Sequence, residues 1–313
     1  MSLRVLSGAG LATIQDLGRV GWERFGVPVC GAMDQFAIRA ANYLVGNPPQ
    51  AACVETMLAQ LTLLAEDDLI VATTGRGWRL RIDSRDIPPW MAAVARGGER
   101  IELIPDGQPG WGYLAASGGV NVPLVMGSRS TYLRGGFGGL LGRILQRGDS
   151  LPIGSHAPFN RLQQRAGTSL SPDIIPPYAN QVTVHLIPGP QLDAFSEAAL
   201  PALLENEYTL TAACDRMGYR LAGTPLTHRH TADFLSEGTP FGSVQVPGDG
   251  QPVVLMADRQ ATGGYAKIGV VASADLPLLA QCPADGGKVR FVITSPIEAA
   301  IRLRKMYNHF TNP

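Results

Sequence analysis

A faint internal repeat is the feature of this sequence that most constrains its fold. Residues 126–129 (MGSR) precede the glycine-rich stretch 135–137 (GGF), and residues 256–259 (MADR) precede 263–265 (GGY). The two methionines, Met126 and Met256, are 130 residues apart. Each copy follows an apolar run and leads towards a leucine-rich or apolar segment. A repeat of this length predicts two similar domains rather than a short-period solenoid.

The composition favours short strands and turns over long helices. The chain of 313 residues holds 37 glycines and 24 prolines, the residues that end regular structure. Charged residues are 17% of the chain, against about 25% in typical globular proteins. The formal net charge of +0 gives no sign of nucleic-acid or acidic-membrane binding. Because interface cores are poor in charge, we expect another protein chain to cover part of the surface.

The cysteines and the hydropathy bear on the cellular compartment. The four cysteines form no C-x-x-C pair and have no clustered histidine, so free thiols in a reducing compartment are expected: Cys30, Cys53, Cys214 and Cys282. No run approaches the roughly 18 apolar residues of a membrane span, and no secretory leader pattern opens the chain. These patterns predict a cytoplasmic protein.

Regular structure can be placed along most of the chain. Asp34 is a natural N-cap for a helix over residues 34–45, which the sequence GNPP then stops. Short apolar runs predict strands over residues 61–64, 68–73, 78–82, 100–104, 112–116, 182–187, 208–212 and 288–293. The stretch 151–180 lacks periodicity and is interpreted as a linker between a first domain, 1–150, and a second, 181–313.

The densest polar cluster lies between two apolar runs, at residues 258–265 (DRQATGGY). Arg259 and Gln260 can grip a carboxylate or phosphate, since arginine offers a planar fork of donors. Gly263 and Gly264 permit positive φ and close approach of the backbone to a bound group. The alternative is a tight, hydrogen-bonded hairpin loop without a ligand.

A second polar cluster covers residues 214–221 (CDRMGYRL). Strand alternation would place Arg216, Gly218 and Arg220 on one face and so leave a basic slot for an anion. An edge strand displaying two solvated arginines explains the pattern equally well. Gln245, in a separate strand, is of a type that is more often structural than catalytic. His228 and His230 alternate without nearby carboxylates or cysteines, so no metal site is predicted.

These and other segments resemble the KipA family, also called allophanate hydrolase subunit 2 or the biotin-dependent carboxyltransferase A/B subdomains. The matching segments are TIQDLGR at 13–19, GVP at 26–28, GAMD at 31–34, ANYLVGN at 41–47, RMGYRL at 216–221, SEG at 236–238, QVP at 245–247 and DRQATGGY at 258–265. Two departures stand out: Ala261 replaces an expected threonine, and Cys214-Asp215 replaces an expected Ser-Asn. The resemblance implies a mainly β fold of two cyclophilin-like β-barrel subdomains and a KipI-like partner that shares the site.

The residues and the resemblance together predict a site. Catalytic roles are expected for Arg216, Arg259 and Gln260. Substrate contacts are expected for Arg220, Gln245, Thr262, Gly263, Gly264, Tyr265 and Asp34.

Three functions fit this resemblance. The first is a subunit of ATP-dependent 5-oxoprolinase, which opens the lactam of 5-oxo-L-proline together with a KipI-like B subunit and a LamB/YcsF-like A subunit. The second is a carboxyltransferase that moves CO₂ from carboxybiotin to urea or a related amide. The third is a non-catalytic regulator that binds a KipI-like kinase inhibitor. The chain has no Ala-Met-Lys-Met motif for attached biotin and no G-x-x-x-x-G-K-[ST] loop, so ATP is expected to bind at a place shared with the partner.

Overall fold

The computed structural model describes residues 1–8 and 10–310, and it confirms the mainly β class. Its contacts divide the chain into two compact units. Among the described residues, the first unit holds 1–8, 10–19, 30–175, 309 and 310. The second holds residues 20–29 and 176–308. The short segment 20–29 thus belongs with a part of the chain that follows it by some 150 residues.

The first unit is built from a six-stranded and a five-stranded sheet. In sheet order, the first is β11 (Ser150–Pro152), β1 (Ser2–Gly8), β4 (Leu61–Ala65), β9 (Arg100–Pro105), β6 (Trp78–Ile82) and β7 (Arg85–Ile87). The second is β2 (Thr13–Gln15), β3 (Cys53–Thr56), β10 (Gly112–Ala116), β5 (Leu69–Gly75) and β8 (Ala92–Ala95). Side chains from both sheets share one apolar core that includes Leu63, Val71, Trp78, Ile101 and Leu114.

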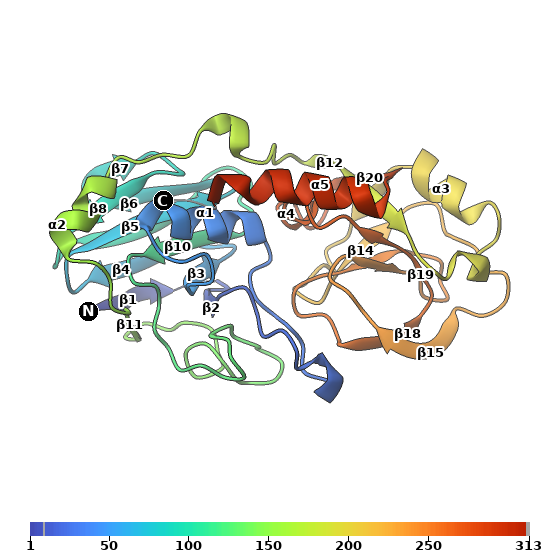
Figure 1. Cartoon of the computed structure of the whole chain (residues 1–313), viewed down its shortest axis with the longest axis horizontal. Coiled ribbons are helices and arrows are strands. Elements are labelled where there is room, and N and C mark those ends of the chain that lie inside the picture. Colours follow the sequence, from blue (N-terminus) through green and yellow to red (C-terminus); the bar gives the residue numbers. More distant parts are fainter. Residues whose placement is uncertain (9, 311–313) are drawn as a thin grey trace. The chain divides into compact units, whose positions relative to one another are not determined.

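Helix α1 (Gln35–Val45) covers strands β5 and β10 of the first unit (Figure 1). Its start is set by Asp34, whose side chain accepts a hydrogen bond from the Ala37 N–H. Its end is set by Gly46 at φ 77°, where a side chain would be strained. The predicted helix and its N-cap are confirmed.

The second unit closes as a seven-stranded barrel. Around the barrel the order is β12 (Gln181–Pro188), β19 (Lys267–Val271), β16 (Ser243–Gln245), β17 (Val253–Leu255), β14 (Gly218–Ala222), β13 (Tyr208–Leu210) and β20 (Lys288–Ile293). Its first and last strands, β12 and β20, pair in parallel and complete the barrel. A separate two-stranded ribbon joins β15 (Asp233–Gly238) to β18 (Thr262–Tyr265).

Short helices complete each unit. The second unit carries α3 (Ala199–Glu205), α4 (Leu276–Ala280) and α5 (Pro296–Tyr307), and Figure 1 places α5 on the opposite side of this unit from the β15–β18 ribbon. The stretch 151–180, predicted as a linker, contains part of β11, helix α2 (Phe159–Leu162) and turns of 3-10 helix at Gln163–Arg165 and Pro172–Ile174. No helix in the described part of the chain has the length and apolarity needed to cross a bilayer.

Candidate functional site

The second unit contains all the predicted site residues except Asp34. Strand β17 leads into residues 256–261, and β18 carries Thr262, Gly263, Gly264 and Tyr265. Gln245 ends strand β16, two strands away from β14 in the barrel. Residues widely separated in sequence therefore meet around the loop 256–261.

A buried ion pair anchors this loop. Arg216 donates from Nε to one carboxylate oxygen of Asp258 and from Nη2 to the other, both at 2.9 Å. The Asp258 N–H donates in turn to the carbonyl of Arg216 at 2.8 Å. The two side chains are only 9% and 7% exposed. The prediction that Arg216 and Arg220 form a basic slot on one strand face is thus wrong. Arg216 precedes strand β14 and binds Asp258, whereas Arg220 is exposed.

Arg259 holds the loop to the segment that follows the ribbon strand β15. Its Nε donates to the carbonyl of Thr239 at 2.7 Å, and its guanidinium carbon lies 5.3 Å from the centre of the Phe241 ring. The Thr239 hydroxyl donates to the carbonyl of Gln260. These contacts give Arg259 a positioning role for the loop, and its predicted grip on a carboxylate stays a prediction.

Two glutamine side chains meet beside the loop. Gln260 donates from Nε2 to Oε1 of Gln245 at 3.2 Å, and Gln245 is buried. A Cβ added to Gly263 would lie 2.6 Å from Nε2 of Gln245 and 3.1 Å from Nε2 of Gln260. Glycine is needed here for close packing against the two carboxamides, since neither Gly263 nor Gly264 has positive φ. Gln260 is the more exposed of the two glutamines. Its carboxamide can both donate and accept hydrogen bonds, so it can pair with the N–H and the carbonyl of an amide or lactam.

Tyr265 connects the ribbon to a hollow of about 680 Å³ in the second unit. Its walls include His228, His230, Asp233 and Asp249. The Nε2 atom of His228 lies 3.0 Å from the carbonyl oxygen of Val246, so this ring is already held by the backbone. Thr262 is exposed on the same ribbon as Tyr265, where it can contact a bound molecule.

Three residues of this region were not predicted from the sequence. Lys267 is buried at the start of β19, and its Nζ lies 3.1 Å from a carboxylate oxygen of Glu237 in β15. Gln191 donates to the same oxygen at 2.9 Å and accepts from the Lys267 N–H at 2.8 Å. Lys267 of β19 is the register partner of Gln245 in the adjacent strand β16, which links this network to the carboxamides. A single lysine at the head of the apolar run KIGVV was the available signal.

Asp34 lies in the first unit and is fully buried. Its side chain caps α1, and its backbone N–H donates to the Tyr113 hydroxyl at 2.8 Å. The structure therefore gives Asp34 a structural role, and a substrate contact stays a prediction.

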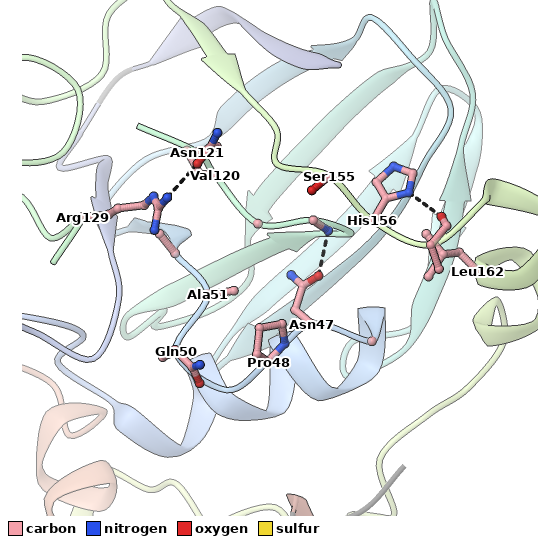
Figure 2. A pocket seen from close by; sticks show the side chains of 15 residues that line it. Asn47, Pro48, Gln50, Ala51, Val120, Asn121, Arg129, Ser155, His156 and Leu162 are labelled. Atoms are coloured by element: carbon pink, nitrogen blue, oxygen red, sulfur yellow. Dashed lines mark hydrogen bonds between the residues drawn. The ribbon is translucent and has the colours of Figure 1, made fainter. Parts of the chain in front are cut away.

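A polar hollow of about 350 Å³ in the first unit is lined by none of the predicted site residues. Figure 2 shows Asn47 and Arg129 on its walls, each bonded to a neighbour. Asn47 Oδ1 accepts from the Gly118 N–H at 2.8 Å, and Arg129 Nη2 donates to Asn121 Oδ1 at 2.7 Å. These two hydrogen bonds hold parts of the wall together, whereas Nε2 of His156, also on the wall, is buried and has no hydrogen-bond partner among the described residues.

Cys214 offers a test of the predicted chemistry near Arg216. Burial raises the pKa of the Cys214 thiol, which disfavours the thiolate that acts as nucleophile. We expect Cys214→Ser to keep most of the activity of the assembled enzyme, measured as steady-state kcat/KM. A loss above roughly 100-fold, the scale of a positioned catalytic group, would contradict this expectation.

Side chains able to ligate a metal do not cluster in the described part of the chain. No group of three or more His, Cys, Asp or Glu side chains gathers there in a way that could hold an ion. The four cysteines form no disulfide with one another, and three of them are buried.

Comparison with known proteins places the chain in a family. The family model described as "Carboxyltransferase domain, subdomain A and B" matches residues 25–293. The C subunit of 5-oxoprolinase from Escherichia coli is 38% identical over 303 residues, which cover 97% of this chain and 94% of that protein. The protein of the same name from Haemophilus influenzae is 38% identical over 301 residues, 96% of this chain and 94% of that protein.

Solved structures agree with this match. The crystal structure of the K. lactis urea amidolyase superposes with a TM-score of 0.87 at 25% identity, covering 100% of this chain and 20% of that one. The family match thus covers both units of the fold as well as the polar loop 256–261. The chain belongs to the carboxyltransferase domain family, subdomains A and B.

Proposed function

We propose that this protein is one subunit of an ATP-dependent 5-oxoprolinase. The observation that carries the proposal is the extent of the match to two proteins named as the C subunit of 5-oxoprolinase, which spans 97% of this chain and 94% of the E. coli protein. In the urea amidolyase of Saccharomyces cerevisiae the matched region is 16% of the protein, so there the same module is one part of a much larger chain.

The carboxamide pair fits the proposed substrate. The lactam of 5-oxo-L-proline carries an N–H donor and a carbonyl acceptor, and Gln260 presents the complementary groups beside Gln245. Opening the lactam is uphill, so ATP has to activate the amide oxygen before water attacks. Donors that stabilise the developing charge are needed at that oxygen. Gln260 and the exposed Thr262 hydroxyl are the groups of this chain that we assign to binding and orienting the lactam.

The proposal includes partner subunits. A KipI-like B subunit would contribute the rest of the site and a LamB/YcsF-like A subunit would complete the enzyme, with ATP held at a place shared between chains. The E. coli and H. influenzae relatives are each named as one subunit of an oxoprolinase, and these names are what supports a multi-subunit assembly. We also propose that this chain carries no covalently attached biotin.

A second candidate function is carboxyl transfer from carboxybiotin to an amide such as urea. Its support is the TM-score of 0.87 to the K. lactis urea amidolyase over the full length of this chain. The carboxamide pair would serve urea as well as a lactam, so the reaction has to be decided by assay.

We expect the isolated chain to be inactive and the assembled complex to hydrolyse ATP only in the presence of 5-oxo-L-proline. The measurement is ADP and glutamate formation by this chain alone, by the two partner subunits without it, and by all three together. Urea with carboxybiotin is the control substrate. Turnover of 5-oxo-L-proline by the isolated chain would refute the shared site, and urea-dependent loss of carboxybiotin would support the second candidate.

A further inference from the structure

The first unit contains a buried arginine that forms no ion pair with any residue the structure describes. Arg19 is 1% exposed and is among the largest fully buried side chains of the protein. Its Nη2 donates to the carbonyl of Ser130, and its guanidinium carbon lies 5.0 Å from the centre of the Phe137 ring. Its Nε and Nη1 are shielded from solvent and have no hydrogen-bond partner in the described structure. Burying a charge in this state is strongly unfavourable unless something pairs with it.

The nearest acid in sequence is already saturated by other donors. Asp16 accepts from the hydroxyls of Ser128 and Ser130 at 2.6 and 2.5 Å. It also accepts from the backbone N–H groups of Arg129 and Gly18, at 2.6 and 2.8 Å. Four donors satisfy this carboxylate without any contribution from Arg19. Within the described residues, Arg19 therefore forms no ion pair with this or another carboxylate.

The loop that covers Arg19 is shaped around the guanidinium. Gly138 has φ 73°, and a Cβ added there would lie 2.8 Å from Nη2 of Arg19. Two other residues of the same loop, Met126 and Leu141, have positive φ of 53° and 59° although they are not glycine. Such strain persists where the surrounding structure requires one conformation, and it is concentrated at ligand sites and switch segments.

We propose that Arg19 binds the anionic group of a small ligand, a carboxylate or a phosphoryl group, and that the loop 126–142 opens to admit it. An anion would supply both the missing acceptors for Nε and Nη1 and the missing negative charge, whereas a buried water would supply acceptors alone. When the loop is closed, the Phe137 ring and the Ser130 carbonyl would hold the guanidinium plane against the bound anion. The site lies in the first unit, and the proposal does not depend on which reaction the carboxamides of the second unit serve.

Binding to the full chain, without partner subunits, tests the proposal. The probes are inorganic phosphate and 5-oxo-L-proline, with 2-pyrrolidone as the neutral lactam that lacks the carboxylate. We expect at least one of the two anions to raise the melting temperature and to bind in calorimetry, and 2-pyrrolidone to do neither. A response to 5-oxo-L-proline alone identifies a substrate carboxylate, and a response to phosphate identifies a phosphoryl site.

Substitutions then locate the binding. Arg19→Gln should weaken the anion about tenfold to hundredfold, the range of a charge-assisted hydrogen bond. Arg129→Gln is the matched control, because Arg129 lies in the same loop but has its guanidinium bonded to Val122 and Asn121, and it should bind the anion like the parent. Arg19→Lys keeps the charge with fewer donors and should fold and bind weakly, so a folding defect of the glutamine variant would not hide the effect.

The melting temperature without ligand supplies a second readout. Because an uncompensated buried charge is removed, Arg19→Gln should be at least as stable as the parent in the absence of anions. Failure of both anions to bind the parent, or equal binding by Arg19→Gln and the parent, would overturn the proposal. The oxoprolinase assay uses the assembled complex, so a negative result there leaves this test unaffected.

Discussion

Replacing Asp258 with alanine should destabilise the second unit by about 3–5 kcal/mol, the cost of leaving one member of a buried ion pair unpaired. Arg216 would keep its guanidinium in a place where its side chain is 9% exposed, without the two bonds of 2.9 Å that now satisfy it. At roughly 2–4 °C for each kcal/mol, the melting temperature should fall by about 6–20 °C. Thermal unfolding followed by circular dichroism measures this change.

Two further variants separate the ion pair from a general effect of mutation. Removing both charges, as in Arg216→Met with Asp258→Leu, should recover most of the lost stability, because no unpaired charge remains. Glu205→Ala removes an exposed carboxylate from the same unit and should leave the melting temperature within about 1 °C. An Asp258→Ala protein that melts like the parent would show that the pair does not hold the loop.

Gln260→Ala is expected to lower kcat/KM of the assembled enzyme by roughly 5- to 150-fold while changing the melting temperature little. A hydrogen bond to a buried ligand group contributes about 1–3 kcal/mol, which sets this range. Among the described residues, the Gln260 side chain makes one hydrogen bond, of 3.2 Å to Gln245, and it is only half-buried, so its structural contribution is small. Steady-state kinetics and thermal unfolding have to be measured on the same preparation.

Arg259→Lys is the contrasting variant for the same loop. Because Arg259 binds the Thr239 carbonyl and lies over Phe241, we expect this change to lower the melting temperature. Gln251→Ala alters a glutamine of the same unit that bonds to Gly223 away from the loop, and it should leave kcat/KM unchanged. Parent-like kinetics with a lowered melting point for Gln260→Ala would mean that residues 258–265 form a structural hairpin and no more.

Local sequence signals predicted one helix and several of the strands. Strands expected at 78–82 and 112–116 are found at those residues, because alternating or continuous apolar residues bounded by turn formers are a local property. The helix beginning after Asp34 was likewise set by its own cap. Helix α5 was missed although Ser295 and Glu298 form a capping box in front of it, since it buries few residues and has a weak apolar stripe.

The contacts of the candidate site could not be predicted in the same way. The pairing of Arg216 with Asp258 joins residues 42 positions apart, and Gln245 of β16 meets Gln260 of the loop 256–261. Such long-range geometry has no local signature, so the sequence led us to expect Arg216 in an anion-binding slot or solvated on an edge strand. Lys267 was overlooked for the same reason, because its partner Glu237 lies in the ribbon and not beside it in the chain.

The closure of the barrel has a consequence for how the second unit acquires its structure. Gln181 of β12 pairs with Lys288 of β20, 107 residues later, and five more pairs follow along the same two strands. Parallel pairing across such a distance forms slowly. A long loop has to close, at a cost in entropy, before any contact between the two strands is gained. During synthesis, the earlier strands of this barrel would stand with open edges until residues 288–293 have left the ribosome. The exposed edges of that intermediate are the part of the folding path most open to mispairing with other chains.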